Sequence, residues 1–223
     1  MRKLLIVLVV LGLVAVVADR VALKFATDEA QRRLVSAGLT SPKVHVSGFP
    51  FLTQALSRHF DDVQVNATSA EIGIGRAEHV SGTAQDVKVP SSGPATAGQL
   101  TAKGTIPYAE VLRQVDQPGL QLSNAGAGQV ELRRDVTVLG RTYSAVARGR
   151  VKPDGNRLLV TPTSVQLAGG GVIDSRLSSL IKDRVSVSYR IRGLPDGVKI
   201  ERIAPTDAGF VVGVSGRDVQ LVS

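Results

Sequence analysis

Apolar and polar residues alternate along most of the chain after Pro42, and no other feature of the sequence constrains the fold as strongly. Successive side chains of a strand point to opposite faces, so this period of two predicts half-buried β-strands. The strand-like segments are 43–49, 61–75, 86–90, 100–106, 130–139, 142–151, 158–167, 185–191, 198–204 and 210–214. Turn residues such as Pro153–Asn156 join neighbouring segments, and such short connections favour hairpins. We therefore expect roughly eight to ten strands in a mostly antiparallel sheet.

Helical periodicity is limited to the N-terminal part and a few short stretches. Between Asp19 and Ala37 apolar residues recur every three or four positions, which predicts a helix with Gly38 as its C-cap. Its apolar positions are Leu23, Ala26, Ala30, Leu34 and Ala37. Shorter helices are expected over 53–60, 107–112 and 174–184, and the last of these would bury Leu177, Leu180 and Ile181. Helices and strands in mixed order, with no long linker, predict a single α+β domain over residues 19–223.

The first 18 residues form a signal peptide or an N-terminal membrane anchor. Arg2 and Lys3 precede an unbroken apolar run of fifteen residues, Leu4–Ala18. As a helix this run spans about 22 Å, short of the roughly 30 Å hydrocarbon core of a bilayer, and it fits the apolar part of a signal peptide. The alternative is an uncleaved anchor, with the charges of Asp19 and Arg20 at the lipid surface. In either case the protein is exported, and the positive residues hold the N-terminus on the cytoplasmic side.

Residues 48–54, GFPFLTQ, place two of the five Phe of the chain on either side of a proline. Pro50 has no N–H donor, fixes its own φ and disfavours helix at Phe49. The motif therefore ends a strand and turns the chain before a short helix, for which Thr53 is the expected N-cap.

Apolar side chains gather around this corner. Phe49, Phe51 and Leu52 are expected to meet Leu56 and Phe60 within one strand-corner-helix unit. The cluster either caps the core at one end of the sheet or lines a pocket for an amphiphile. An acyl chain in such a pocket gains about 0.8 kcal/mol per buried CH₂.

Residues for metal binding or catalysis do not converge in the sequence. The chain has no Cys, which excludes disulfides, thiolate metal sites and a Cys nucleophile. None of the three His lies at ligand spacing from another His or a carboxylate, and the adjacent Asp61 and Asp62 are expected in a turn before a strand. No serine-hydrolase, dinucleotide-binding or P-loop motif is found. We therefore expect no metal, no cofactor and no catalytic residue, and a protein that is not an enzyme.

The net charge of +8 favours anionic partners. The basic residues are spread thinly, and the chain has few aromatic side chains to interleave with them, as nucleic-acid binding requires. The charge therefore fits anionic lipid headgroups or an acidic envelope polymer, and it argues little for nucleic acid.

The stretch 44–65, VHVSGFPFLTQALSRHFDDVQV, resembles the hallmark of the LmeA-like phospholipid-binding proteins of actinobacteria. That hallmark is a strand, a corner of Gly, Phe, Pro, Phe, Leu and Thr, a short helix and an acidic start to the next strand. The N-terminal apolar segment, GTIPY at 104–108 and the closing stretch 194–221 are also similar. The resemblance covers nearly the whole chain and is most specific at the corner, to which Gly48, Pro50 and Thr53 belong.

The resemblance implies a tubular lipid-binding fold like that of the bactericidal permeability-increasing proteins. In that fold a highly curved antiparallel sheet wraps a long helix and encloses an apolar groove. The named member of the family binds phospholipids, including phosphatidylinositol species, and supports elongation of the lipomannan core in the cell envelope. The implied protein carries no catalytic residues, and its partners are phospholipid, the membrane surface and proteins of envelope glycan synthesis.

We therefore expect a non-enzymatic protein of the bacterial envelope that binds or shuttles phospholipid or lipid-linked glycan precursors. The residues expected to line its groove are Phe49, Phe51, Leu52, Leu56, Leu34, Leu177 and Leu180. One alternative is a scaffold that recruits envelope glycosyltransferases without a lipid cargo, which predicts a solid core. Another is an enzyme acting on glycolipids, which requires convergent polar side chains.

Overall fold

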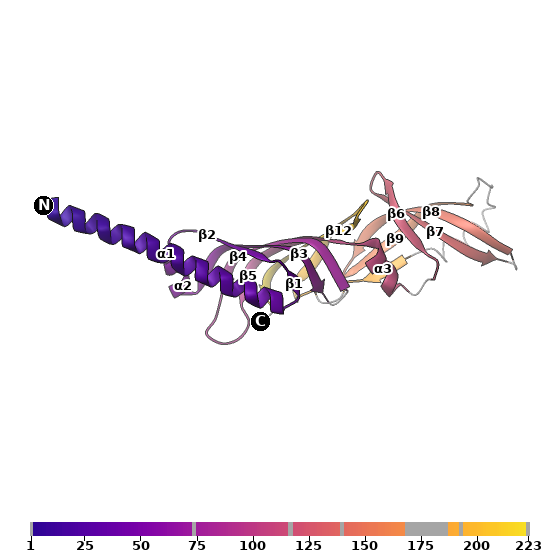
Figure 1. Cartoon of the computed structure of the whole chain (residues 1–223). Coiled ribbons are helices and arrows are strands. Elements are labelled where there is room, and N and C mark those ends of the chain that lie inside the picture. The colour runs from indigo at the N-terminus through magenta and orange to yellow at the C-terminus, as the bar shows by residue number, and fades with distance from the viewer. Residues whose placement is uncertain are drawn as a thin grey trace.

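The computed structural model describes residues 2–72, 75–115, 118–138, 141–167, 187–191 and 194–221 of the 223-residue chain. The helix expected over 174–184 lies outside the described residues, and with it Leu177, Leu180 and Ile181. The molecule is elongated, with a long helix projecting at one end, one sheet in the middle and a second sheet at the other end (Figure 1). In chain order the elements are α1 (Arg2–Ser36), β1 (Leu39–Thr40), β2 (Lys43–Ser47), α2 (Phe51–Ser57), β3 (His59–Ile72), β4 (Gly75–Lys88), β5 (Thr96–Ile106), α3 (Tyr108–Gln114), β6 (Gln121–Gly126), β7 (Gln129–Val138), β8 (Arg141–Asp154), β9 (Arg157–Leu167), β10 (Val187–Arg190), β11 (Val198–Thr206) and β12 (Gly209–Gln220).

The strands form two open sheets. The first has seven strands in the order β1-β3-β4-β5-β12-β11, with β2 also paired to β3, and the second has five in the order β10-β9-β8-β7-β6. The chain leaves the first sheet after β5, builds the second, and returns through β11 to β12, which pairs with β5. Every strand pair in the described residues is antiparallel. The expected α+β class and antiparallel pairing are confirmed, but the strands divide between two sheets where one was expected.

The main hydrophobic core lies where the two sheets meet. It combines side chains of β5, β11 and β12 with side chains of the second sheet and of α3, among them Ile106, Ile200, Ile203, Phe210, Val130, Leu132, Leu158, Val160 and Val111. The fully buried Phe210 ring meets Tyr108 edge to face, with ring centroids 4.9 Å apart. The Tyr108 hydroxyl donates a hydrogen bond to the Thr206 carbonyl at 2.7 Å. This core joins the first sheet to the second through apolar contact rather than through charge.

Helix α1 is longer than the sequence pattern predicts, because it runs without a break through the apolar N-terminal segment and the expected helix over 19–37. It ends as expected, since Gly38 has φ +96° and its amide donates to the Val35 carbonyl at 3.0 Å. The helix packs mainly against β1, β2 and α2, and its N-terminal half projects beyond the first sheet (Figure 1). The expectation that a curved sheet wraps around this helix to form a tube stays a prediction.

The length and apolar character of the helices decide whether any of them could span a membrane. Within the residues that the structure describes, no helix is both long enough and apolar enough to cross a membrane. The side chains of residues 2–10, where the run begins, are outside the description.

Three local expectations differ from the structure. Strands β1 and β6 were not expected, and β4 runs for 14 residues, well beyond the segment 86–90 that predicted it. The strand expected over 61–75 corresponds to β3, which begins two residues earlier. Asp61 and Asp62 lie inside β3 and not in a turn, because that strand already begins at His59. Helix α2 begins at Phe51 with Pro50 at the N-cap, so Thr53 is inside the helix and caps nothing. A proline suits this place because the first helical turn needs no donor from it.

Alkaline pH should destabilise the fold through Tyr108. Burial, followed by the negative charge of Asp207, raises the pKa of Tyr108 to about 12, whereas a tyrosine in an unfolded chain titrates near 10. The folded state therefore favours the neutral phenol. Its stabilising contribution is complete below about pH 10 and is lost as the pH rises through about 12. Urea unfolding at a series of alkaline pH values should show this loss.

The matched variant for this test is Tyr108→Phe, which keeps the ring against Phe210 and removes the ionisable hydroxyl. It should lower the free energy of unfolding by about 1 kcal/mol at neutral pH, through the lost hydrogen bond to Thr206. Its stability should then fall less steeply between pH 10 and 12 than that of the parent. Equal slopes for the two proteins would contradict the assignment.

Candidate functional site

The first sheet has one apolar and one polar face, and its strand register shows this directly. One row of paired residues crosses it from β2 to β11 through Val44, Val65, Gly82, Ala102, Val214 and Ile200. The neighbouring row, which points to the opposite side, is Lys43, Asn66, Ser81, Lys103, Gly213 and Arg202. Six strands thus place apolar or small residues on one side, which we call the apolar face, and mostly polar residues on the other, the polar face.

A cavity of about 210 Å³ opens on the apolar face, which we call the apolar cavity. It is lined by Ala70, Ala77, Val80, Leu100, Ala102, Lys103, Gly104, Ile106, Ile191, Leu194, Pro195, Val198, Val212 and Val214. Among these lining residues only Lys103 is charged, and Lys103 also lines a hollow on the polar face. The described residues therefore offer this cavity aliphatic contacts and small side chains, which suit an acyl chain or a similar apolar group.

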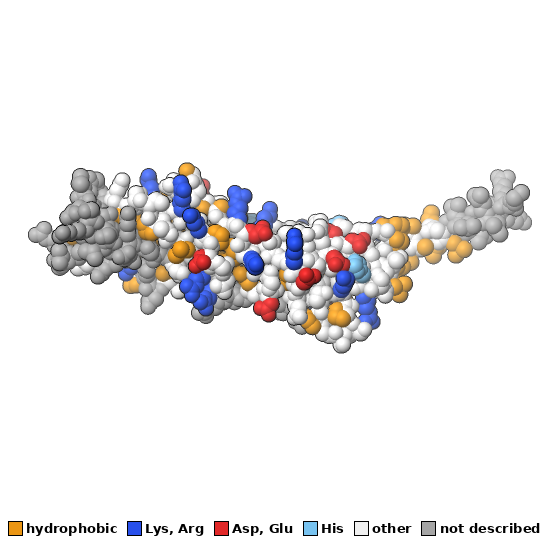
Figure 2. Space-filling view, turned by 180° about the vertical axis from the view of Figure 1, so that it is seen from behind, with side chains coloured by type: hydrophobic (Ala, Val, Ile, Leu, Met, Phe, Trp, Pro, Cys, Tyr) orange, Lys and Arg blue, Asp and Glu red, His pale blue; other side chains and the backbone are white. Residues whose placement is uncertain are grey.

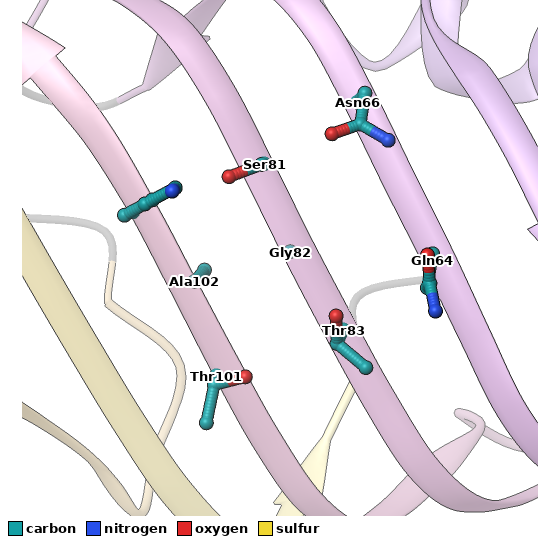
Figure 3. A pocket seen from close by; sticks show the side chains of 8 residues that line it. Gln64, Asn66, Ser81, Gly82, Thr83, Thr101 and Ala102 are labelled. Atoms are coloured by element: carbon teal, nitrogen blue, oxygen red, sulfur yellow. The ribbon is translucent and has the colours of Figure 1, made fainter.

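The polar face carries a hollow of about 310 Å³ (Figure 3). Its lining side chains stand on β3, β4 and β5 and include Gln64, Asn66, Ser81, Thr83 and Thr101 (Figure 3). They are amides and hydroxyls, with Lys103 as the charged member, and no carboxylate or histidine of the described residues lines the hollow. These side chains provide neither a general base nor a cluster of metal ligands. We therefore interpret the polar face as the side of the sheet that is exposed to solvent.

The two phenylalanines of the corner have different roles. Phe51 is buried, with 4% of its surface exposed, and its ring lies 6.0 Å from the ring of Phe60. Phe49 is 57% exposed, and the guanidinium carbon of Arg20 lies 5.2 Å from its ring centroid. Phe51 therefore anchors the corner in the core, while Phe49 lies outside and takes part in a cation–π contact with α1.

A buried carboxylate joins this corner to α1. Asp19 is 2% exposed, and its Oδ1 accepts a hydrogen bond from the Leu52 amide at 2.8 Å. Its Oδ2 is buried without a hydrogen-bond partner in the described structure. The anchor alternative placed the charges of Asp19 and Arg20 at the lipid surface, and that placement stays a prediction. Within the protein, the long helix turns the Asp19 side chain inward, onto the first turn of α2.

The side chain of Gln54 holds the other side of the corner. Its amide nitrogen donates to the Ser47 carbonyl at 3.1 Å, and its amide oxygen accepts from the Asp61 amide at 3.1 Å. Gln54 thereby ties the end of β2 to the start of β3. Gly48, which lies between them, has φ +97°, and a Cβ on it would be 2.3 Å from the Gln54 amide nitrogen. The glycine is needed both for its backbone conformation and for this close approach.

The structure separates the residues that were expected to line one groove. Phe51 and Leu52 line a hollow of about 470 Å³ between α1, α2 and residues 89–91, which we call the corner hollow. Leu34 is half-buried on α1, and Phe49 and Leu56 are exposed. None of these five lines the apolar cavity, and the two remaining candidates, Leu177 and Leu180, lie outside the described residues.

Sequence reasoning missed the residues that do line the apolar cavity. Most of them come from β4, β5, β11 and β12, and examples are Leu100, Ala102, Val212 and Val214. Their period-two alternation was visible in the sequence. What the sequence did not reveal is the pairing of β12 with β5, which places residues more than a hundred positions apart side by side.

One polar contact was also missed. The Nε2 atom of His59 lies 3.2 Å from Oδ1 of Asp86, because β3 pairs with β4 and brings His59 opposite Lys88. The spacing of the histidines in the sequence did not indicate this contact, because it depends on the pairing of the two strands. No group of three or more His, Cys, Asp or Glu residues in the described parts of the chain could hold a metal ion.

Replacing Gly48 by alanine should destabilise the corner more than the same change at Gly93. Both glycines have a similar positive φ, +97° and +94°, but a Cβ at Gly93 meets nothing within 4 Å. Gly93→Ala should therefore cost about 1 kcal/mol of backbone strain, and Gly48→Ala about 1–3 kcal/mol more through the clash with Gln54. Urea unfolding of the two variants measures the difference. Equal losses would show that the Gln54 contact is unimportant.

Removing the Asp19 carboxylate should loosen the joint between α1 and the corner. Asp19→Ala leaves the Leu52 amide without its acceptor and should lower the free energy of unfolding by about 2 kcal/mol. Hydrogen exchange at the Leu52 amide should accelerate at the same time. Asp28→Ala, at an exposed position of the same helix, is the control and should change neither quantity. If both variants leave Leu52 equally protected, the hydrogen bond does not hold the joint.

A known protein family matches most of the chain. A family model described as LmeA-like phospholipid-binding matches residues 17–215, which is most of the 223-residue chain. No curated protein matches the sequence. The matched range begins just before Asp19, includes the whole corner and extends into β12. The chain belongs to the LmeA-like phospholipid-binding family.

Proposed function

We propose that this protein binds phospholipid by laying acyl chain against the apolar face of the first sheet, with the apolar cavity as the deepest part of the site. The observation that carries the proposal is the aliphatic lining of that cavity, supplied by strands β3, β4, β5, β11 and β12 together with residues 191–195. Membership of a phospholipid-binding family supports the same class of ligand.

The energetics fit a carrier that exchanges lipid with a membrane. Moving about ten methylene groups from water to an apolar surface gains roughly 8 kcal/mol. The same groups gain little on transfer from a bilayer, because both environments are apolar. Lipid can therefore enter and leave such a site at modest cost, provided that it does not cross water on the way.

We propose that the protein does not act as an enzyme. In the described part of the chain the apolar cavity is lined by aliphatic side chains and Lys103. The described lining of the polar hollow includes no carboxylate or histidine of the kind that hydrolysis or glycosyl transfer of a lipid would require. The scaffold alternative expects a solid core, and the apolar cavity favours a lipid-binding role over it.

We also propose where the protein resides in the cell and in which process it takes part. The N-terminal positive residues followed by the apolar run support export and residence at the outer face of a bacterial cell membrane, with the N-terminus in the cytoplasm if the run is retained. The net charge of +8 supports an anionic ligand, such as a phosphatidylinositol-type lipid. The family resemblance supports a tubular shape, with the sheet around the helix, and a role in maintaining lipomannan-type envelope glycans beside the proteins that synthesise them.

The test is native mass spectrometry of the protein purified from bacterial membranes, with the variants Ala102→Phe and Thr101→Phe. Ala102 also borders the hollow on the polar face, but the register places it in the apolar row beside Gly82 and Val214, and it lines the apolar cavity. A phenylalanine there should therefore fill the cavity and reduce co-purifying phospholipid severalfold. Thr101 is the preceding residue of β5 and lines the hollow on the polar face, so the matched substitution should leave the bound lipid unchanged.

Two outcomes would reject the proposal. The first is a parent protein that carries no phospholipid and takes up none from vesicles, which would favour the scaffold alternative. The second is an equal effect of the two variants, which would place any bound lipid away from the apolar face. Thermal unfolding of both variants checks that neither has lost its fold.

A further inference from the structure

Most of the exposed large apolar side chains lie at one end of the molecule, and Val35 at the C-terminal end of α1 is the exception among them. In the described residues those on α1 are Leu11, Leu13, Val14, Val16, Val17, Val21, Phe25 and Val35, and the others are Phe49, Leu52, Leu56 and Val89. None in this set comes from the second sheet. Figure 2 shows apolar side chains along the part of α1 that projects from the body, and Figure 1 places α2 beside α1 where that projection begins. We call Phe25, Phe49, Leu52, Leu56 and Val89 the apolar collar.

The collar comes from three elements that are fixed to one another. The Leu52 amide is bonded to Asp19 of α1, and Phe49 lies against Arg20 of the same helix. On the other side, the Val89 amide donates to the Arg58 carbonyl at 3.0 Å, which fixes the end of β4 beside the end of α2. The exposed rings and aliphatic groups are therefore held in place by buried or backbone contacts and do not belong to a loose loop.

The exposure of these side chains is unusual for a surface in water. Leu56 is 85% exposed, Phe25 71% and Phe49 57%, although the neighbouring corner hollow offers apolar walls from Ala22, Ala26 and Ala55. Large apolar side chains that are exposed at the same end of a protein indicate an interaction surface. A partner of this surface must therefore present an apolar region to the collar.

Cations stand at the rim of the collar. Arg58 follows α2 directly, and Lys88 precedes Val89 at the end of β4. Both line a hollow of about 620 Å³ next to the corner hollow, and the two hollows share Arg58, Val89, Pro90 and Ser91. Asp86 lies nearby, within 3.5 Å of the Lys88 ammonium and 3.2 Å of the His59 ring, whereas no ion pair of Arg58 is recorded in the described structure. An apolar surface bordered by cations matches the cross-section of an anionic bilayer, with acyl chains below and phosphates above.

We infer that the apolar collar docks the body of the protein on an anionic phospholipid bilayer. Leu52, Leu56 and Val89 enter the boundary between headgroups and acyl chains, and Arg58 and Lys88 lie at the level of the phosphates. A bilayer fits better than a protein partner because the exposed apolar segment of α1 leaves the body at the same end as the collar. The hydrocarbon core of one bilayer can therefore cover both the collar and that segment. This inference rests on the proposed function in one respect, since docking gives lipid a route from the membrane to the body without crossing water.

The absence of cysteine from the chain makes a direct test simple. Leu56→Cys and Val89→Cys, each labelled with an environment-sensitive fluorophore, are prepared in the full chain and added to phosphatidylcholine vesicles with and without phosphatidylglycerol. Val35→Cys is the matched control, because Val35 is a 55% exposed apolar residue of α1 near the other end of the helix. The mutated positions are exposed enough that the labels should not disturb the fold.

On vesicles containing phosphatidylglycerol, the labels at 56 and 89 should shift to the blue and be quenched severalfold more than the label at 35 by a nitroxide attached to lipid. Neutral vesicles should give a smaller shift. Three results would overturn the inference: equal quenching at 35 and 56, a blue shift at 56 without quenching by lipid, or equal shifts with and without phosphatidylglycerol. The second result would indicate a protein partner.

Failure here can be told apart from failure of the proposed function. A protein that carries phospholipid in native mass spectrometry but shows water-exposed labels at 56 and 89 binds lipid without docking through the collar. A protein whose labels enter the bilayer but which carries no phospholipid docks on membranes and is not a carrier.

Discussion

The hydrogen bond from the Leu52 amide to the buried Asp19 carboxylate fixes the relation between the long helix and everything else at its end of the molecule. Helix α1 touches the body mainly through α2, β1 and β2, and much of its surface is exposed and apolar. Without a polar joint, such a helix could slide or rotate on an aliphatic contact. The Asp19 side chain is buried, and one of its oxygens has no hydrogen-bond partner among the described residues. Such a polar group is costly to bury unless its other oxygen is bonded, so the bond to Leu52 sets the register of α1 along the corner.

The same joint determines which side of the corner is exposed. With Leu52 held by its amide and Phe51 buried against Phe60, the side chains of Phe49, Leu52 and Leu56 are left at the surface. Arg20, the residue after Asp19, then comes to lie over the Phe49 ring. One carboxylate on α1 thus explains both the buried and the exposed half of the Gly-Phe-Pro-Phe-Leu-Thr motif.

The sequence supports prediction of the elements better than of the site. Period-two alternation is a local property, so β5, β7, β8, β9 and β11 could be predicted, and so could the helix end at Gly38. The position of a residue in a sheet depends on pairing between distant segments, and no local pattern indicated that β12 would pair with β5 and bring Val214 beside Ala102. For that reason the expected groove residues were chosen around the conspicuous aromatic corner, whereas the apolar cavity is built from inconspicuous Ala, Gly and Val residues. The inward turn of Asp19 was missed for a related reason: a charge next to an apolar run is usually solvated, and only the approach of α2 provides its partner.

The small residues of the apolar face have a physical consequence for lipid binding. Gly82, Gly104, Ala70, Ala77 and Ala102 leave room above the strands that Leu or Phe would fill, and the backbone of the sheet supplies the floor. A protein that only needed a stable core would gain from larger side chains here, because tight packing is favourable and a cavity is not. The sheet instead keeps space along one face while its large apolar residues are concentrated in the core between the two sheets. The cavity nevertheless borders that core, because Ile106, Ile191 and Val212 belong to both. A lipid bound there as proposed would therefore lie against the junction that holds the two sheets together.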